Sequence, residues 1–169
     1  MSGARLRISA GLLMFRRITG QGGAGEIEVL LVHPGGPFWE NKDAGAWSIP
    51  KGVQERDDEE LLARAKIEFE EELGVAPPAL TPSELIVLGS VKQKGGKTVH
   101  AWACEGDFTG PARSNTMKCE WPLRSGRRLT FPEVDRAEWF ALDAAREKIN
   151  SAQAAFLDRL VEKLGSFSA

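Results

Sequence analysis

Short apolar runs alternate along the chain with segments rich in glycine, proline and charge. Residues 9–15 and 26–33 are two such runs, rich in branched side chains and bounded by turn-forming residues, and they predict two strands. The glycine-rich segment 20–25 between them predicts a hairpin turn. A brief extended piece at 47–49 is expected to stop at Pro50, whose nitrogen cannot donate a hydrogen bond.

Residues 57–73 carry the clearest helical pattern. The segment has no glycine or proline, and its apolar residues recur at spacings of three and four, as in a stripe that faces a core. Asp57 or Asp58 is placed to cap the start, and Gly74 is placed to end the helix in a left-handed conformation. The stripe consists of Leu62, Ala65, Phe69 and Leu73.

The second half of the chain predicts another hairpin, a last strand and two helices. Residues 85–93 and 98–105 are expected to form the hairpin, which turns around a pair of glycines. The last strand ends near Trp139, and residues 143–149 and 152–164 have helical patterns. Strands and helices interleave without the regular alternation of a doubly wound parallel sheet. We therefore expect an α/β architecture with a mixed β-sheet sandwiched between α-helices.

Residues 106–129 have mixed composition and few periodic signals. We expect a long loop here, placed to cover a functional site. The segment contains a basic cluster, Arg124, Arg127 and Arg128, which is either solvated or in contact with a phosphate.

The composition narrows the class of protein. Apolar residues form 42% and charged residues 27% of the chain, a balance typical of one globular domain, here spanning residues 1–169. The net charge of −2 gives no positive field for long nucleic acids. No run approaches the ~18 apolar residues that cross a membrane, and no signal peptide is visible, so we expect a cytoplasmic protein. Cys104 and Cys119 match no zinc or disulfide spacing.

Three carboxylates in the predicted helix point to metal chemistry. Glu68, Glu71 and Glu72 fall within a sector of about 100° on the helical wheel. Like charges at this spacing destabilise a helix unless they are solvated or neutralised by a cation. Hard divalent cations prefer such oxygen ligands. The alternative from the helix alone is a solvated acidic face.

The tract from residue 52 to residue 75 resembles the Nudix box. That signature runs Gly, five residues, Glu, seven residues, Arg-Glu, an apolar residue, any residue, Glu-Glu, any residue, Gly and an apolar residue. When positions are counted back from Gly74, seven of the nine agree. They are Glu59, Glu68, Phe69, Glu71, Glu72, Gly74 and Val75.

Two positions depart from the signature. Gly52 lies one residue too far upstream, and we assign the extra residue to the loop at 53–58, because an insertion in the helix would rotate its apolar stripe by about 100°. The arginine position holds Ile67. Arg64, which faces Glu68 at i,i+4, and Lys66 are the two cations able to substitute. Lys66 takes the arginine position if the extra residue lies beside Ile67 instead.

The resemblance extends beyond the box, from about residue 9 to residue 164. Residues 45–52 are similar to the Trp-x-x-Pro-Lys-Gly segment of a bacterial Nudix group and of dinucleoside polyphosphate hydrolases. Residues 131–140 look like a segment that follows the catalytic loop in many members. The resemblance implies the Nudix fold and metal-dependent hydrolysis of a phosphoanhydride bond in a nucleoside diphosphate linked to X, such as a nucleoside triphosphate or a dinucleoside polyphosphate. The implied partner is a small nucleotide, and the resemblance also allows a homodimer.

The same resemblance implies roles for individual residues. Glu68, Glu71 and Glu72 are expected to hold Mg²⁺ or Mn²⁺ and to be catalytic, while Gly52, Glu59, Arg64 and Lys66 support them. The general base is Glu133, Glu120 or a box glutamate. Lys51 is expected to contact a phosphate. Trp47 is expected to bind the substrate, and Trp39 and Trp121 are further candidates to stack on a base.

A Nudix-fold module that binds a nucleotide or regulates without cleaving it is the main alternative. Ile67 favours this reading, because the arginine that orients the box glutamates is missing at its usual position. Turnover of a nucleotide panel separates the two readings. A purely structural protein with an acidic helix is the third.

Overall fold

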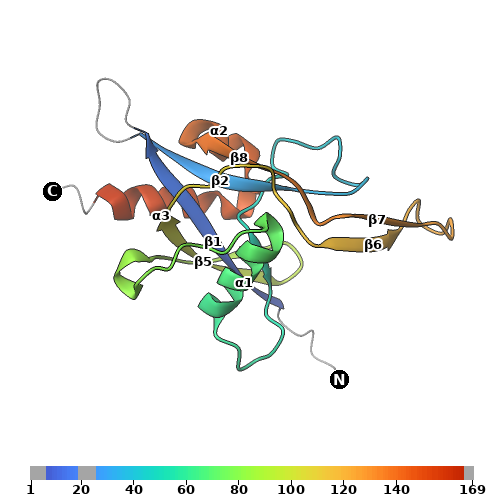
Figure 1. The fold of residues 1–169 in the computed structure, drawn as a ribbon, viewed down its shortest axis with the longest axis horizontal. Helices are drawn as coiled ribbons and strands as arrows, with labels where there is room; N and C mark the ends of the chain where they lie inside the picture. The colour runs from blue at the N-terminus through green and yellow to red at the C-terminus, as the bar shows by residue number, and fades with distance from the viewer. Residues whose placement is uncertain (1–6, 19–25, 166–169) are drawn as a thin grey trace.

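A mixed sheet forms the middle of the molecule in the computed structural model, which describes residues 7–18 and 26–165 (Figure 1). The strand order is β4-β5-β1-β2-β8, and β3 pairs with β1. β1 runs parallel to β5, whereas the other pairs are antiparallel. The strands are β1 (Arg7–Ile18), β2 (Glu26–Pro34), β3 (Lys51–Val53), β4 (Ile86–Gln93), β5 (Lys97–Glu105) and β8 (Val134–Ala141).

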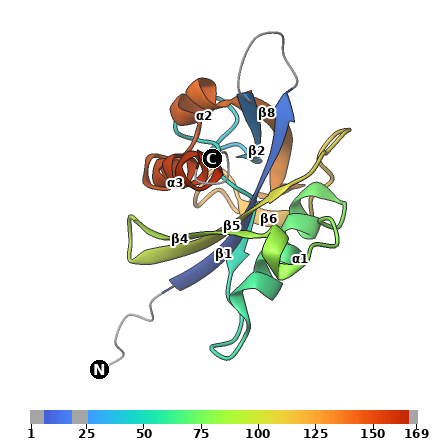
Figure 2. The same ribbon diagram turned by 90° about the vertical axis from the view of Figure 1, so that its left-hand side faces the viewer.

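Helices cover both faces of this sheet, as the sequence predicts (Figure 2). α1 (Leu61–Leu73) packs on one face, and α2 (Leu142–Lys148) and α3 (Ala154–Gly165) pack on the other. Two short 3₁₀ helices, η1 (Pro82–Glu84) and η2 (Ser151–Gln153), lie in the connections between these elements. None of the described helices is long and apolar enough to cross a membrane.

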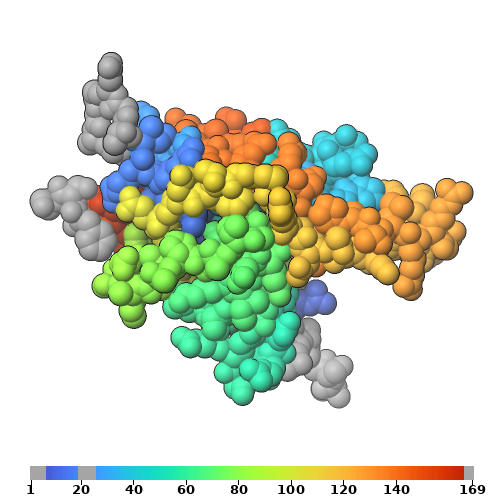
Figure 3. Space-filling model, in the orientation of Figure 1, coloured from blue at the N-terminus to red at the C-terminus, as the bar shows by residue number. Residues whose placement is uncertain are grey.

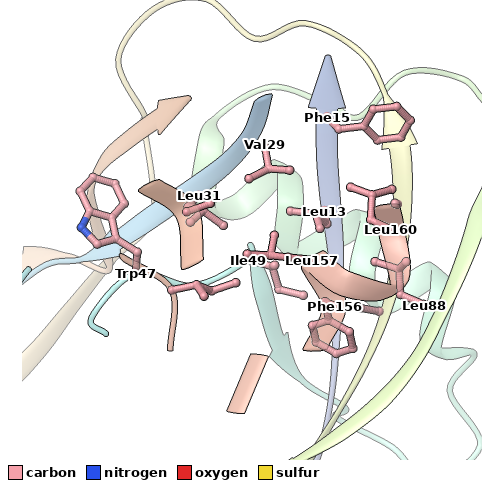
Figure 4. Close-up of a cluster of buried hydrophobic side chains, with 14 of the residues drawn as sticks. Leu13, Phe15, Val29, Leu31, Trp47, Ile49, Leu88, Phe156, Leu157 and Leu160 are labelled. Carbon is pink, nitrogen blue, oxygen red and sulfur yellow. The ribbon is translucent and has the colours of Figure 1, made fainter. Parts of the chain in front are cut away.

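β1 is buried on both faces, which explains its continuous apolar run. Leu12 and Met14 face α1, whereas Leu13 and Phe15 face α3. Figure 4 shows the α3 side of the core, where Leu13 and its neighbours meet helix residues. The predicted turn at 20–25 lies outside the described residues, but its flanking strands pair antiparallel as expected.

α1 begins four residues later than predicted. It starts after Glu60, which has extended backbone angles and provides no side-chain cap, so neither Asp57 nor Asp58 caps the helix. The preceding residues form a loop instead, because the side chain of Glu59 accepts a hydrogen bond from the backbone of Glu55. The C-terminal prediction is confirmed, since Gly74 has φ 80° and ψ 5°.

Residues 106–129 contain a hairpin where a long covering loop was predicted. β6 (Thr116–Glu120) pairs antiparallel with β7 (Arg128–Pro132), and the two strands project from the body of the molecule (Figure 3). The prediction was wrong because the sequence gives no alternating apolar face, and most residues of both strands are exposed. The arm carries the predicted arginine cluster and points outward from the sheet (Figure 1).

Candidate functional site

β3 brings the start of the glutamate tract against α1. Gly52 pairs with Ala10 of β1, and its Cα lies so close to α1 that a Cβ there would be 1.9 Å from the Cδ of Glu68. Only glycine leaves this space, so Gly52 determines where the Glu68 carboxylate lies. The glycine, which the sequence analysis expects to support the site, thus lies against Glu68 although it is one residue away from its position in the signature.

Arg64 organises the glutamates of this region. The residue is 5% exposed, and its guanidinium lies 2.6 Å from Glu59 and 3.2 Å from Glu68 and also contacts Glu55. These hydrogen bonds raise the pKa of Arg64, and the bond from Arg64 lowers the pKa of Glu59. A planar guanidinium can bond several carboxylates at once. Arg64 therefore links two glutamates of the loop before α1, Glu55 and Glu59, to Glu68 on the helix.

Ile67 takes no part in the network of Arg64. Its side chain is 42% exposed and points away from the core. Arg64 contacts two glutamates of the tract, whereas Lys66 forms no ion pair with a described residue. Of the two cations able to substitute, Arg64 is the one in position. This agrees with the extra residue lying in the loop before α1.

Glu72 is the most unusual group of the site. It is 9% exposed, and its Oε2 atom is buried and has no hydrogen-bond partner among the residues that the structure describes. Burial raises the pKa of Glu72 to about 8, opposed by the positive charge of Lys51 and reinforced by Glu68 and Glu133. An unpartnered buried carboxylate oxygen is costly, and a cation would satisfy it.

The other carboxylates share this electrostatic field. Burial and then the charge of Glu71 raise the pKa of Glu68, although Arg64 opposes this. The pKa of Glu133 is also raised, first by burial and then by Glu71. In the described part of the chain no three acidic, histidine or cysteine side chains are close enough together to hold a metal ion as they stand. A divalent cation would nevertheless satisfy the unpartnered oxygen of Glu72 and relieve the repulsion among the neighbouring glutamates.

A cavity of about 350 Å³ opens beside Glu72. Lys51 lines it. Burial lowers the pKa of this lysine, although the negative charges of Glu72 and Glu68 oppose the shift. Glu133 also lines the cavity, in agreement with its candidate role as general base. Further polar side chains line the cavity, and the sequence did not predict them. This polar wall contains Gln93, Lys97, Asn150 and Gln153.

Trp47 does not fit its predicted role in substrate binding. The ring is 1% exposed and belongs to the buried cluster that Figure 4 shows. It packs edge-on against His33 and Phe140, and its Nε1 donates to Asp43 at 2.8 Å. Such a ring is unavailable for stacking, so this prediction is wrong and Trp47 is a core residue. Trp39, the neighbouring candidate, does line the cavity.

The remaining candidates lie on the β6–β7 arm. Trp121 and the arginine cluster occupy its turn and outer strand, and none of them lines the cavity. Glu120 accepts a hydrogen bond from the Gly126 backbone across the same turn. It is therefore a turn residue, and the expectation that it acts as the base is not supported.

Gly52→Ala will lower turnover while leaving the fold nearly as stable. The new Cβ would push the carboxylate of Glu68 away, and a displacement of this order at a catalytic site costs about tenfold or more in rate. The end of a side chain moves cheaply, so urea unfolding should change by less than about 1 kcal/mol. Gly165→Ala is the matched control, because a Cβ there meets nothing within 4 Å. Equal turnover of the two variants would contradict the positioning role of Gly52.

Solved structures confirm the predicted fold. A C. elegans Ap4A hydrolase, solved as a binary complex, matches with a TM-score of 0.61 and 20% identity over 94% of this chain and 99% of that chain. The NUDIX domain of Shewanella oneidensis NrtR, solved with ADP ribose, matches with a TM-score of 0.61 and 16% identity over 96% and 90%. A mutT/nudix family protein from Listeria innocua matches with 0.59 and 15% over 95% of each chain. These similarities show the Nudix fold. By sequence, no family model and no curated protein matches the chain.

Proposed function

We propose that this protein is a metal-dependent hydrolase that cleaves a phosphoanhydride bond in a nucleoside diphosphate linked to a further group X. The observation that carries the proposal is the buried, unpartnered oxygen of Glu72 at the edge of a cavity lined by Lys51. When a diphosphate binds with its divalent cation, the cation can neutralise the Glu72 carboxylate and the negative diphosphate can pair with Lys51.

Glu68, Glu71 and Glu72 are the proposed ligands of Mg²⁺ or Mn²⁺. When bound, the ion supplies positive charge that neutralises the diphosphate and favours attack by water. Arg64 would hold Glu68 in place through its contact with that carboxylate, and Gly52 leaves room for the same carboxylate. This ligand set retains the Nudix box roles that the sequence suggests.

The chain's own residues supply the remaining chemistry. Glu133 reaches the cavity, and its raised pKa makes it a better acceptor of the proton from the attacking water than an ordinary carboxylate. Lys51 and Lys97 line the cavity, where they can contact the phosphate oxygens and stabilise charge as it develops. Trp39 is the aromatic side chain available to a base.

The rival proposal is a module that binds a nucleotide without cleaving it. It rested on Ile67, and the network of Arg64 with Glu59 and Glu68 removes that support. The proteins of similar fold are described as an Ap4A hydrolase and as a domain in complex with ADP ribose. Both ligands contain a nucleoside diphosphate, which is why we favour this substrate class for the cavity.

A substrate panel tests the proposal. The protein is incubated with nucleoside triphosphates, dinucleoside polyphosphates, ADP-ribose and nucleotide sugars in Mg²⁺ or Mn²⁺, and released phosphate and nucleotide are measured. We expect turnover of at least one compound and its complete loss in EDTA, because the glutamates act through the ion. Tight binding of one compound without turnover would favour the binding module instead.

Three further properties belong to the proposal. We propose that the chain folds as one domain over residues 1–169, that it acts in the cytoplasm, and that it can form a homodimer. Sedimentation velocity separates a monomer from a dimer directly.

A further inference from the structure

A fully buried amide fixes the chemistry of one cavity wall. Gln153 is 0% exposed, and its Oε1 accepts a hydrogen bond of 3.0 Å from the backbone nitrogen of Ile49. Because a backbone N–H can only donate, the oxygen of Gln153 must face it, and the Nε2 group must face the other way. That Nε2 donates to Ser48 Oγ at 3.0 Å and to Gln93 Oε1 at 3.2 Å.

The orientation of Gln153 determines what Gln93 offers to a ligand. The oxygen of Gln93 is occupied by Gln153, so its NH₂ group is the part left for the cavity. Within residues 7–18 and 26–165 that NH₂ group has no partner. Gln93 therefore directs its oxygen at Gln153 and can offer its NH₂ donor to a ligand.

Asn150 presents the same chemistry on the same wall. Its Oδ1 accepts a hydrogen bond of 2.9 Å from the backbone of Ala152, as the cap of η2, and its NH₂ group remains. Lys51 and Lys97 line the same cavity and have only donors. Two amide donors thus lie on one wall of the cavity that Trp39 also lines, whereas the lysines Lys51 and Lys97 and the carboxylates Glu72 and Glu133 belong to the proposed diphosphate and metal end.

We infer that this wall selects a nucleobase whose edge carries acceptors only, namely a 6-oxopurine such as guanine or hypoxanthine, over adenine. Guanine offers O6 and N7 as neighbouring acceptors, whereas adenine offers one acceptor and the N6 donor. An amide recognises adenine by turning its oxygen and its NH₂ group to the base together, and both amide oxygens are directed at protein donors here. Gln93 and Asn150 are the specificity residues, and Gln153 is the positioning residue. The inference rests on the proposed function, because it concerns the base of that substrate.

Binding of nucleoside monophosphates tests the inference without requiring any cleavage. Dissociation constants of GMP, IMP and AMP are measured by titration calorimetry with the full chain. We expect GMP and IMP to bind about tenfold more tightly than AMP, because adenine leaves a donor facing a donor. Equal affinities, or no binding of GMP and IMP, would overturn the inference.

Two nearly isosteric variants identify the residues. Gln93→Glu keeps the oxygen that accepts from Gln153 and replaces the NH₂ group by an acceptor, and Asn150→Asp does the same while keeping the η2 cap. Each should reduce the GMP-to-AMP preference about tenfold, and the ratio cancels any repulsion of the phosphate. Lys92→Gln is the control, since it changes the net charge equally on an exposed part of β4. An unchanged ratio in both variants would contradict the assignment.

These readouts separate the inference from the proposed function. A preference for GMP that Gln93→Glu removes, without turnover of any panel compound, supports the base subsite and contradicts hydrolysis. Equal turnover of GTP and ATP that neither variant alters supports hydrolysis and contradicts the subsite.

Discussion

Glu72→Gln will lower metal-dependent turnover about 10³-fold. The variant retains the shape of the side chain and removes the negative charge that the proposed cation requires at the buried Oε2 atom. Initial rates are measured at saturating Mn²⁺ with the best substrate of the panel. Metal affinity should fall in parallel, as titration with Mn²⁺ would show.

Glu70→Gln is the matched control for this variant. Glu70 lies on the same helix two residues earlier, is exposed and contacts none of the site carboxylates. Its replacement removes the same charge from the helix and should leave turnover unchanged. If both variants lose activity equally, the general charge of α1 matters and Glu72 has no special role.

The pH dependence of the stability of Glu72→Gln gives a second readout. In folded, metal-free protein the pKa of Glu72 is raised to about 8 from 4.5, so the folded state binds this proton more tightly than the unfolded state. The resulting stabilisation is fully present below pH 4.5 and is lost as the pH rises to about 8. Glu72→Gln lacks this loss. Urea unfolding in EDTA gives the free energy of unfolding at each pH. From pH 5 to pH 9 this free energy should fall by up to about 4 kcal/mol more in the protein with Glu72 than in Glu72→Gln.

Arg64→Met will impair both the fold and the site. The change leaves Glu59 and Glu68 without the cation that now lies within 3.2 Å of each. Removing one partner of a buried ion pair destabilises by about 3–5 kcal/mol, which thermal unfolding measures. Turnover should fall about 10²-fold, because ligands that lose their supporting contacts are no longer oriented.

Two comparisons separate orientation from simple destabilisation. Arg64→Lys keeps the charge without the planar fork, so it should retain much of the stability but little of the turnover. Ile67→Arg adds an arginine at the signature position, where the side chain is 42% exposed, and should leave turnover unchanged because Arg64 already contacts the glutamates. A large rise in turnover with Ile67→Arg would contradict the role given to Arg64.

The sequence by itself determined the elements that bury an apolar face. The sequences of β1 and β2 are apolar runs because helices cover the sheet on both sides. The pattern of α1 predicts a helix because its buried residues Ala65, Phe69 and Leu73 recur every four positions. The glutamates of α1 were visible for the same reason, since residues three and four apart share a helix face. The β6–β7 arm was missed because neither of its faces is buried.

Only the tertiary structure decided which distant residues meet. Local periodicity tells which side of a segment is buried but does not give its neighbours, which depend on strand register and helix packing. Trp47 and Trp39 look alike in sequence, yet one lies in the core and the other lines the cavity. Gln153 reaches Gln93 across sixty positions because α3 and η2 pack beside the end of β4. The donor wall therefore follows from three-dimensional proximity, which no local pattern encodes, whereas the contact of Arg64 with Glu68 was already expected from their i,i+4 spacing.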